Sequence, residues 1–196
     1  MRLIIVRHGE TTEQHKNIMQ GQINPSLNEN GTKQAEKLAK NLINENIDRI
    51  YCSTLKRCRE TIQPYLKLKD TPIIYTSKLM ERNYGIFDGK PAKNFKDYLK
   101  ENDLIGNFDF KLPKGESFTE LQDRVYNYLK NKILKNQGNI LVVTHNSVHI
   151  AICLYILNKT TKAYDEFHIG TTGLSEFNIE EKRTEIIKLN STEHLS

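Results

Sequence analysis

The sequence contains little cysteine and no long apolar run, and both absences narrow the class of protein. Among its 196 residues, Cys52, Cys58 and Cys153 are the three cysteines, and they form no C-x-x-C pair. That spacing argues against a disulfide framework and against a zinc site, so we expect the three thiols to be small core groups. Apolar runs such as residues 3–6 and 140–144 have only the length of a strand, so no membrane span is predicted.

Basic residues exceed acidic ones only modestly, by 29 to 24, which gives a formal net charge of +5. The lysines are scattered through predicted helices among glutamate and apolar residues, a pattern typical of a solvated surface. Without a basic stripe or an aromatic platform, we expect no nucleic acid and no membrane as a partner. Met1 is followed at once by an apolar strand, which leaves no room for a leader peptide, so we expect a cytoplasmic protein. No pattern indicates an oligomeric state.

Short apolar strands followed by amphipathic helices predict an α/β fold. This alternation is typical of a mostly parallel central sheet with helices on both faces, a three-layer sandwich. The residues after Gly173 alternate like two strands joined by a polar turn and predict an antiparallel addition at the sheet edge. The predicted strands cover residues 2–6, 47–53, 71–76 and 139–144, and the predicted helices include 29–44 and 54–67. The second helix is expected to bend or end near Pro64.

The length fits a single domain over residues 1–196. Residues 78–115 show no clear period and are too long for a plain connection, so we expect a cap that contributes to specificity. In this cap, Tyr84, Phe87 and Phe95 can either line a substrate pocket or form the small core of the cap itself. Some lysines of the cap can meet a second anionic group or lie at the surface, such as Lys90, Lys93, Lys111 and Lys114.

Basic and imidazole side chains follow three of the predicted strands. Arg7 and His8 come directly after the first strand. Arg57 lies just after the second strand, and His145 follows the strand over 139–144. Ligands of open parallel sheets bind beyond the carboxyl ends of the strands, where these loops meet. Because guanidinium groups bind phosphate oxygens in a bidentate fork, the four side chains predict a pocket for a tetrahedral phosphate dianion.

A neutral imidazole in such a pocket can attack the phosphorus atom and form a covalent phosphohistidine. The leaving oxygen then needs a proton, which a carboxyl group on the opposite side can supply. Glu81, just beyond the third strand, is our candidate for that acid, and Glu10 is the alternative. The predicted catalytic residues are therefore His8, Glu81, Arg7, Arg57 and His145.

Six short segments stand in a characteristic order and in matching structural contexts. They are RHGET (7–11), SLNENGTKQA (26–35), CSTLKRCRET (52–61), LMERNYGIFDGK (79–90), LPKGES (112–117) and VTHNS (143–147). An R-H-G tripeptide alone is a weak signal, but the ordered set is specific. Together the segments resemble the histidine phosphatase superfamily, which includes cofactor-dependent phosphoglycerate mutases, fructose-bisphosphatase-type enzymes, alpha-ribazole phosphatase and broad-specificity phosphatases.

The resemblance implies a role for each predicted catalytic residue. His8 would be phosphorylated, and Glu81 would be the proton donor. The phosphoryl group would be held by Arg7, Arg57 and His145. The resemblance implies no metal and no cofactor.

The resemblance also implies a substrate-binding set, with two departures from the family pattern. The expected substrate-binding residues are Gln14, Gln20, Gly21 and Asn146. Gln14 stands where the family often has asparagine, so its amide reaches the phosphate from a longer arm. Ile18 stands where the family often has arginine, so a cation is absent at that position.

The expected function is metal-independent hydrolysis of a small phosphorylated metabolite through a phosphohistidine intermediate. A cofactor-dependent phosphoglycerate mutase is the alternative. Relatives with that activity tend to have a longer region between the segments of Glu81 and His145, and a tryptophan soon after the first. This chain has no tryptophan and a short middle region, which favours hydrolysis. A non-catalytic phosphate- or phosphoprotein-binding module is a further alternative, and the presence of both His8 and Glu81 argues against it.

Overall fold

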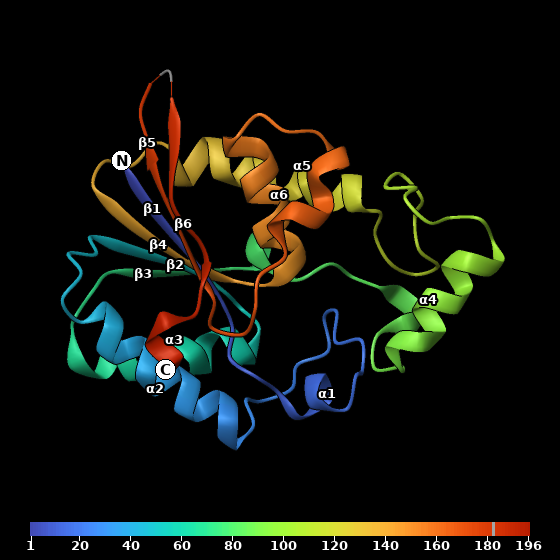
Figure 1. Cartoon of the computed structure of the whole chain (residues 1–196), viewed down its shortest axis with the longest axis horizontal. Helices are drawn as coiled ribbons and strands as arrows, with labels where there is room; N and C mark the ends of the chain where they lie inside the picture. Colours follow the sequence, from blue (N-terminus) through green and yellow to red (C-terminus); the bar gives the residue numbers. More distant parts are fainter. Residues whose placement is uncertain (182) are drawn as a thin grey trace.

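The chain folds around a six-stranded sheet with helices packed against both faces (Figure 1). The structure is a computed structural model that describes residues 1–181 and 183–196. The strand order is β3-β2-β4-β1-β5-β6, and the first four strands in that order run parallel. β5 runs antiparallel to β1 and β6 antiparallel to β5, which confirms the predicted sandwich with an antiparallel addition at the edge. The strands are β1 (Arg2–Arg7), β2 (Arg49–Ser53), β3 (Ile73–Thr76), β4 (Asn139–Thr144), β5 (Leu174–Ile179) and β6 (Thr184–Ser191).

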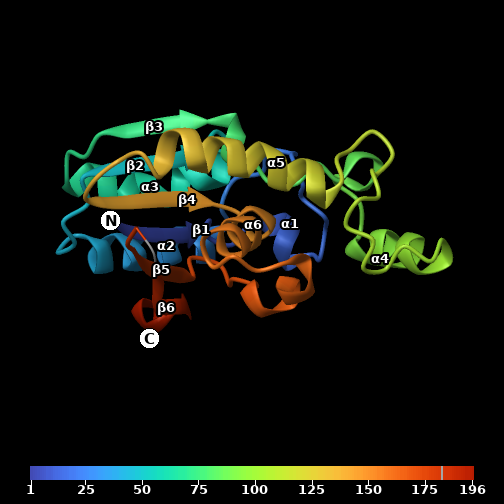
Figure 2. The ribbon, with the colours of Figure 1, turned by 90° about the horizontal axis from the view of Figure 1, so that it is seen from above.

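The side chains of β1 alternate between two apolar cores, one on each face of the sheet. Leu3 and Ile5 belong to one core, and Ile4 and Val6 belong to the other, because successive side chains of a strand point to opposite faces. α5 and α6 cover the first face, and α2 and α3 cover the second (Figures 1 and 2). The helices are α1 (Thr12–His15), α2 (Glu29–Leu42), α3 (Lys56–Leu68), α4 (Ala92–Glu101), α5 (Phe118–Tyr128) and α6 (Asn146–Ile156).

Side-chain caps explain where two of these helices begin. The side chain of Asn28 accepts a hydrogen bond of 2.7 Å from the backbone N–H of Gly31 at the start of α2. Ser117 and Glu120 form a reciprocal capping box at the start of α5. None of the described helices is both long and apolar enough to cross a membrane.

The course of α3 corrects one expectation, because the helix passes through Pro64 and ends only at Leu68. Proline removes one backbone donor, but Pro64 is only half-buried, so water can satisfy the carbonyl that loses its partner. Ile62, two residues before the proline, and Tyr65, directly after it, are completely buried against the sheet. Packing on both sides of the proline therefore outweighs the lost hydrogen bond.

The segment 78–115 leaves the sheet after β3 and carries α4 to one side of the two helical layers, at the right of Figure 1. Its own core is aromatic: the ring centroids of Phe87 and Phe95 lie 5.5 Å apart. An isolated β-bridge between Ile18 and Pro91 ties this segment to the loop that follows α1. The segment therefore borders the N-terminal loops while its bulk stands apart from the sheet.

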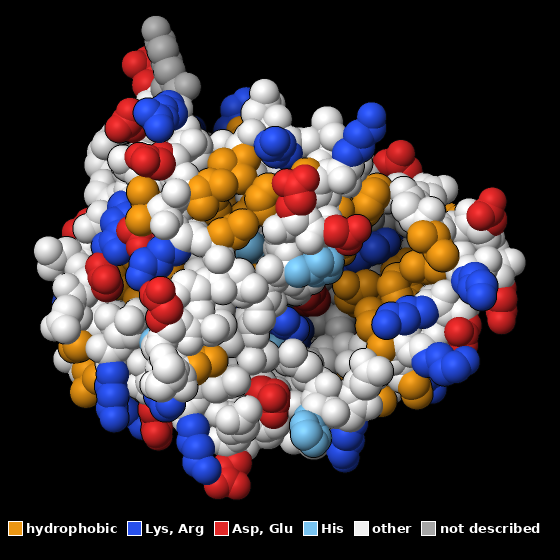
Figure 3. Space-filling model, viewed as in Figure 1, with side chains coloured by type: hydrophobic (Ala, Val, Ile, Leu, Met, Phe, Trp, Pro, Cys, Tyr) orange, Lys and Arg blue, Asp and Glu red, His pale blue; other side chains and the backbone are white. Residues whose placement is uncertain are grey.

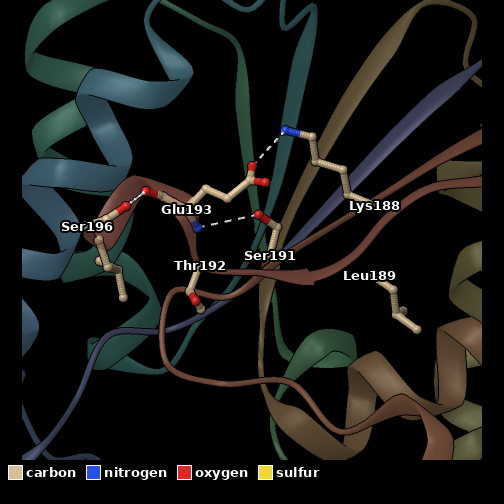
Figure 4. A pocket seen from close by; sticks show the side chains of 7 residues that line it. Lys188, Leu189, Ser191, Thr192, Glu193 and Ser196 are labelled. Atoms are coloured by element: carbon tan, nitrogen blue, oxygen red, sulfur yellow. Dashed lines mark hydrogen bonds and ion pairs between the residues drawn. The ribbon is translucent and has the colours of Figure 1, made fainter.

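The C-terminal residues fold back after β6. Lys188 forms an ion pair of 3.3 Å with Glu193, and the backbone N–H of Glu193 lies 3.4 Å from the hydroxyl of Ser191 (Figure 4). These contacts border an open surface hollow of about 640 Å³. Its lining comes from residues 188–196 and contains none of the predicted site residues.

Candidate active site

The carboxyl ends of the parallel strands bring the predicted basic and imidazole residues together. His8 follows β1 and His145 follows β4, and these strands pair in parallel register up to Arg7 opposite Thr144. As a result, the ring centroids of His8 and His145 lie 5.2 Å apart. Arg57 lies in the first turn of α3, directly after β2, and is completely buried. The sheet itself thus sets the spacing of these side chains.

His8 is held as a neutral imidazole with one nitrogen left for chemistry. Its Nδ1 lies 2.8 Å from the carbonyl oxygen of Gly9. Because a carbonyl can only accept, Nδ1 carries the proton and Nε2 carries the lone pair. Burial lowers the pKa of His8 well below 6.5, and the charges of Arg57 and Arg7 lower it further. The hydroxyl of Thr61 accepts a hydrogen bond of 2.9 Å from the N–H of Gly9 and fixes the loop.

His145 lies beside His8 and is completely buried. Its Nε2 lies 2.9 Å from the hydroxyl of Ser53 and 3.4 Å from the sulfur of Cys58. Burial lowers the pKa of His145 well below 6.5, and the charge of Arg57 adds to the effect. Ser53 ends β2, so the sheet orients this ring through a neighbouring strand. Our reading of the sequence missed Ser53, because a serine between a strand and a helix is typical of an ordinary turn.

Arg7 and Arg57 each keep a buried guanidinium Nε without a partner in the described part of the chain. Nη1 of Arg7 donates to the carbonyl of Ile169 at 2.7 Å. Arg57 donates to the carbonyls of Ile23 and Gly21 at 2.9 and 2.8 Å. The Nε atoms of both arginines are buried, and within the described residues neither has a hydrogen-bond partner. Since buried donors are rarely left unpaired, these two N–H groups mark the place of an acceptor, such as an oxygen of a bound anion.

Glu81 supplies a carboxylate to the same pocket. Its Oε1 accepts a hydrogen bond of 2.8 Å from the backbone N–H of Arg82, and its Oε2 lies 3.5 Å from the N–H of Ser147. Glu10, the alternative acid, does not line the pocket. Its carboxylate instead accepts a hydrogen bond of 2.6 Å from the side chain of Asn28 at the start of α2. The geometry therefore favours Glu81 as the acid.

The four predicted substrate-binding residues also line this pocket: Gln14, Gln20, Gly21 and Asn146. The Oε1 atoms of Gln14 and Gln20 are buried and have no partner in the described part of the chain, so both amides can bind a ligand. Gly21 has φ of +43°, and a Cβ at this position would lie only 1.7 Å from Oδ1 of Asp88. Ile18 is part of the same wall and makes it apolar where the family pattern often has a cation.

Tyr84, Phe87 and Phe95 were expected either to line a pocket or to form the core of the cap, and the structure shows both roles. Tyr84 lines the pocket, and its hydroxyl lies 3.1 Å from that of Ser147. Phe87 is buried in the core of the segment 78–115. Phe95 contacts both rings, with its centroid 5.3 Å from that of Tyr84 and 5.5 Å from that of Phe87. The aromatic core of the segment is thus continuous with the wall of the pocket.

Two of the four lysines for which a second anionic group was considered form ion pairs with neighbouring carboxylates. Lys93 lies 2.5 Å from Asp97, and Lys111 lies 2.7 Å from Glu120. None of the four lysines belongs to the pocket lining. The structure therefore favours a surface location for these lysines over contact with a second anionic group.

Arg124, on α5, holds the segment that carries Glu81. Its Nη2 pairs with Glu116 at 2.6 Å. Its Nη1 donates to the carbonyls of Met80 and Lys78 at 2.8 and 3.0 Å. These bonds fix the backbone just before Glu81. The sequence offers no signal for this role, because an arginine on the polar side of an amphipathic helix is typical of a solvent-exposed residue.

Of the five predicted catalytic residues, Arg7, His8, Arg57 and Glu81 line a pocket of about 160 Å³ at the carboxyl edge of the sheet. His145 is completely buried beside His8 and does not belong to this lining. Figure 3 shows a hollow near the centre of this face, with basic, acidic and histidine side chains at its wall and apolar side chains on its rim. In the described residues, no group of three or more His, Cys, Asp or Glu side chains is arranged to hold a metal ion. The pocket offers fork donors for oxygen atoms, a nitrogen lone pair and one carboxyl group, which is a set that fits a phosphate monoester.

Comparison with known proteins agrees with this geometry. The chain matches the family model of the histidine phosphatase superfamily (branch 1) over residues 3–192. It is 36% identical over 168 residues to a metal-independent phosphoserine phosphatase of Arabidopsis thaliana, covering 81% of this chain and 70% of that protein. It is 29% identical over 205 residues to phosphoserine phosphatase 1 of Hydrogenobacter thermophilus, covering 100% of this chain and 94% of that protein.

A solved structure shares the fold. Phosphoserine phosphatase from Entamoeba histolytica, in complex with 3-phosphoglyceric acid, matches with a TM-score of 0.81 at 25% identity, covering 100% of this chain and 99% of that chain. The chain belongs to the histidine phosphatase superfamily, as its six segments indicated. Its place among relatives named as phosphatases makes it a phosphatase of the histidine-phosphatase type.

Proposed function

We propose that this phosphatase hydrolyses phosphomonoesters without a metal ion, through a phosphohistidine formed on His8. The observation that carries the proposal is the pairing of a neutral His8, whose Nε2 lone pair is free, with the unpartnered Nε donors of Arg7 and Arg57. A nucleophile and two cations around one small pocket are what phosphoryl transfer requires.

In the first step, Nε2 of His8 attacks phosphorus and the bond from phosphorus to the alcohol oxygen breaks. Arg7 and Arg57 compensate the negative charge on the equatorial oxygens in the transition state. Glu81, in its protonated form, gives its proton to the leaving alcohol oxygen. The products are the free alcohol and a phosphohistidine, and Glu81 is left as a carboxylate.

In the second step, the carboxylate of Glu81 removes a proton from a water molecule whose oxygen attacks phosphorus. The bond from phosphorus to Nε2 breaks, and its electron pair returns to His8. Inorganic phosphate leaves, and Glu81 is again protonated. Each group is thereby restored for the next turnover.

The names of the relatives suggest which substrates to test first. Relatives named phosphoserine phosphatases make L-phosphoserine a candidate, and a relative solved with 3-phosphoglyceric acid adds that phosphate. Including 3-phosphoglycerate together with its bisphosphate primer tests the mutase alternative in the same panel. Isomerised product would indicate a mutase, and free phosphate without isomerisation would indicate a hydrolase.

The test is turnover of p-nitrophenyl phosphate and this panel in the presence of a metal chelator, with His8→Ala as the key variant. We expect the wild-type enzyme to release phosphate and His8→Ala to lose at least about 10³-fold in kcat/KM, because the covalent step is gone. His15→Ala is the matched control, since His15 is an exposed histidine outside the pocket. Retention of more than a few per cent of activity in a folded His8→Ala protein would contradict the proposal.

A further inference from the structure

An apolar cleft of about 300 Å³ lies beside the phosphate pocket. One wall comes from α4 and the loop that follows it, and the other comes from the helical turn Thr161–Phe167. Its apolar lining includes Phe95, Leu99, Leu104, Ile105, Phe110 and Tyr164. A cleft of this size with aromatic and aliphatic walls is typical of a site for a small apolar group.

The cleft leaves apolar surface in contact with water. Ile105 is 73% exposed at its edge. Figure 3 shows the apolar patch on the rim of the central hollow, on the side of α4. Contiguous exposed apolar surface of this kind marks a place where a ligand or a partner binds.

Two aromatic rings in contact, Tyr84 and Phe95, separate the cleft from the phosphate pocket. Tyr84 lines the pocket, Phe95 lines the cleft, and their ring centroids lie 5.3 Å apart. Arg82, which also lines the cleft, lies over the ring of Tyr84 at 5.4 Å from its centroid. The two hollows therefore share a wall that a cation and an aromatic ring hold in place.

The position of the acid tells which side of the pocket the alcohol occupies. A general acid must stand next to the oxygen that leaves, so the body of the alcohol extends from the side of Glu81. Oε1 of Glu81 accepts a hydrogen bond of 2.8 Å from the backbone N–H of Arg82, and Arg82 lines the cleft. The direction in which the alcohol leaves His8 is thus the direction of the cleft.

We propose that this cleft binds the alcohol part of the substrate, so that the enzyme prefers phosphomonoesters whose alcohol carries an apolar, ring-containing group. The inference rests on the proposed function, because it assumes that Glu81 faces the leaving oxygen. It assigns substrate selection to the residues from Phe95 to Leu112 and to Tyr164, outside the machinery that handles the phosphoryl group. It also distinguishes this chain from an enzyme built for a small polar alcohol alone.

The test compares 3-phenylpropyl phosphate with n-propyl phosphate. Both are primary alkyl esters, so their leaving groups have similar basicity and differ chiefly in apolar bulk. We expect kcat/KM to be at least about tenfold higher for the phenylpropyl ester, since burial of its ring strengthens binding to the transition state. Ile105→Glu should reduce this ratio about fivefold, through KM, and leave n-propyl phosphate unchanged. Ile187→Glu, at a 48% exposed position of β6 outside the cleft, is the matched control and should leave the ratio unchanged.

Two outcomes would overturn the inference while leaving the hydrolase intact. One is equal kcat/KM for both esters, with activity lost in His8→Ala. The other is a high ratio that Ile105→Glu does not change. If no ester is turned over, the proposed function is wrong. Calorimetry with the two matching phosphonates then tests separately whether the cleft binds the apolar group. Binding of 3-phenylpropylphosphonate about tenfold tighter than propylphosphonate would support it, and equal binding would overturn it. Dimerisation that Ile105→Glu abolishes, with equal phosphonate binding, would assign the cleft to a second copy of the chain instead.

Discussion

The phosphate pocket and the apolar cleft differ in how the chain builds them. Arg7, His8 and His145 stand at the ends of buried parallel strands, and each is fixed by hydrogen bonds to a neighbouring strand or loop. The cleft is built mostly from the continuous segment 95–112, which lies to one side of the sheet, with Tyr164 as its far wall. Rigid strand ends suit groups that must be placed within fractions of an ångström, whereas a separate segment can vary without disturbing them.

This division predicts two kinds of variant. Changes in the phosphate pocket should lower activity toward every substrate in similar proportion. Changes in the cleft should alter the ranking of substrates and leave the reaction with the smallest ester unchanged. Variants of Glu81 and Arg124 test where that boundary lies, and the effect expected for Glu81 is the larger.

The largest of these effects is expected for Glu81→Gln. Loss of the acid should lower kcat/KM for n-propyl phosphate by roughly 10²–10⁴-fold, the usual contribution of a positioned general acid. The loss for p-nitrophenyl phosphate should be about tenfold or less, since p-nitrophenolate leaves without a proton. The ratio of phenylpropyl to n-propyl phosphate should stay as in the wild type. Equal losses for nitrophenyl and alkyl esters would contradict the assignment of Glu81.

A smaller effect on both regions is expected for Arg124→Met, because this arginine anchors one end of the segment that carries both Glu81 and the cleft. Removing it leaves the partly buried carboxylate of Glu116 and two backbone carbonyls without a donor, which should cost about 2 kcal/mol of unfolding free energy. We expect kcat to fall about tenfold for every ester. Denaturant unfolding and steady-state kinetics measure the two quantities, with Lys33→Met as the control at an exposed ion pair. Unchanged kinetics in a destabilised protein would contradict the role of Arg124 in placing Glu81, and would leave it a role in stability alone.

The third prediction concerns the scaffold under the pocket. His149 on α6 is buried, and burial lowers its pKa to about 4. Between pH 6.5 and about 4 the unfolded chain binds a proton at this histidine that the folded chain does not, so acid favours unfolding. The unfolding free energy should fall by about 2 kcal/mol from pH 7 to pH 5 on this account, and the contribution of His149 vanishes well above pH 6.5, where both states are deprotonated. Denaturant curves at both pH values give the unfolding free energies of the wild type and of His149→Gln. The fall from pH 7 to pH 5 should be smaller in the variant by that amount. Parallel pH dependence in the two proteins would contradict it.

The sequence predicts which residues meet at the carboxyl edge of the sheet, for a physical reason. Apolar runs such as 3–6 identify buried strands, and parallel strands must end at a common edge. Residues such as His8 and His145, directly after such runs, are therefore expected to lie close together, and their rings are 5.2 Å apart. The sequence already favoured Glu81 over Glu10, but both follow strands, and only the contacts show that Glu10 bonds to the start of α2.

The cleft and its support could not be predicted in this way. Phe95 and Leu99 stand at helical spacing on α4, a helix that the expectation of no clear period over 78–115 missed. The loop after α4 has no period that indicates which side chains face one another. Tyr164 joins them from a turn far along the chain, and no local pattern connects the two. Arg124 acts through backbone carbonyls, whose positions depend on tertiary structure. The predicted second helix is present, but the expectation that it could end near Pro64 is wrong, because packing of its buried side outweighs the propensity of one residue.

The most direct test of the central claim is to trap the covalent intermediate. Glu81→Gln should still be phosphorylated by p-nitrophenyl phosphate, because that leaving group needs no proton. The variant lacks the base that activates water, so the phosphoryl group should stay on the enzyme. Rapid mixing, an alkaline quench and intact-mass analysis should therefore show one added phosphoryl group, and peptide mapping should place it on His8. The same adduct should be missing from a protein that carries both Glu81→Gln and His8→Ala. No adduct, or a phosphoryl group on another residue, would contradict the account.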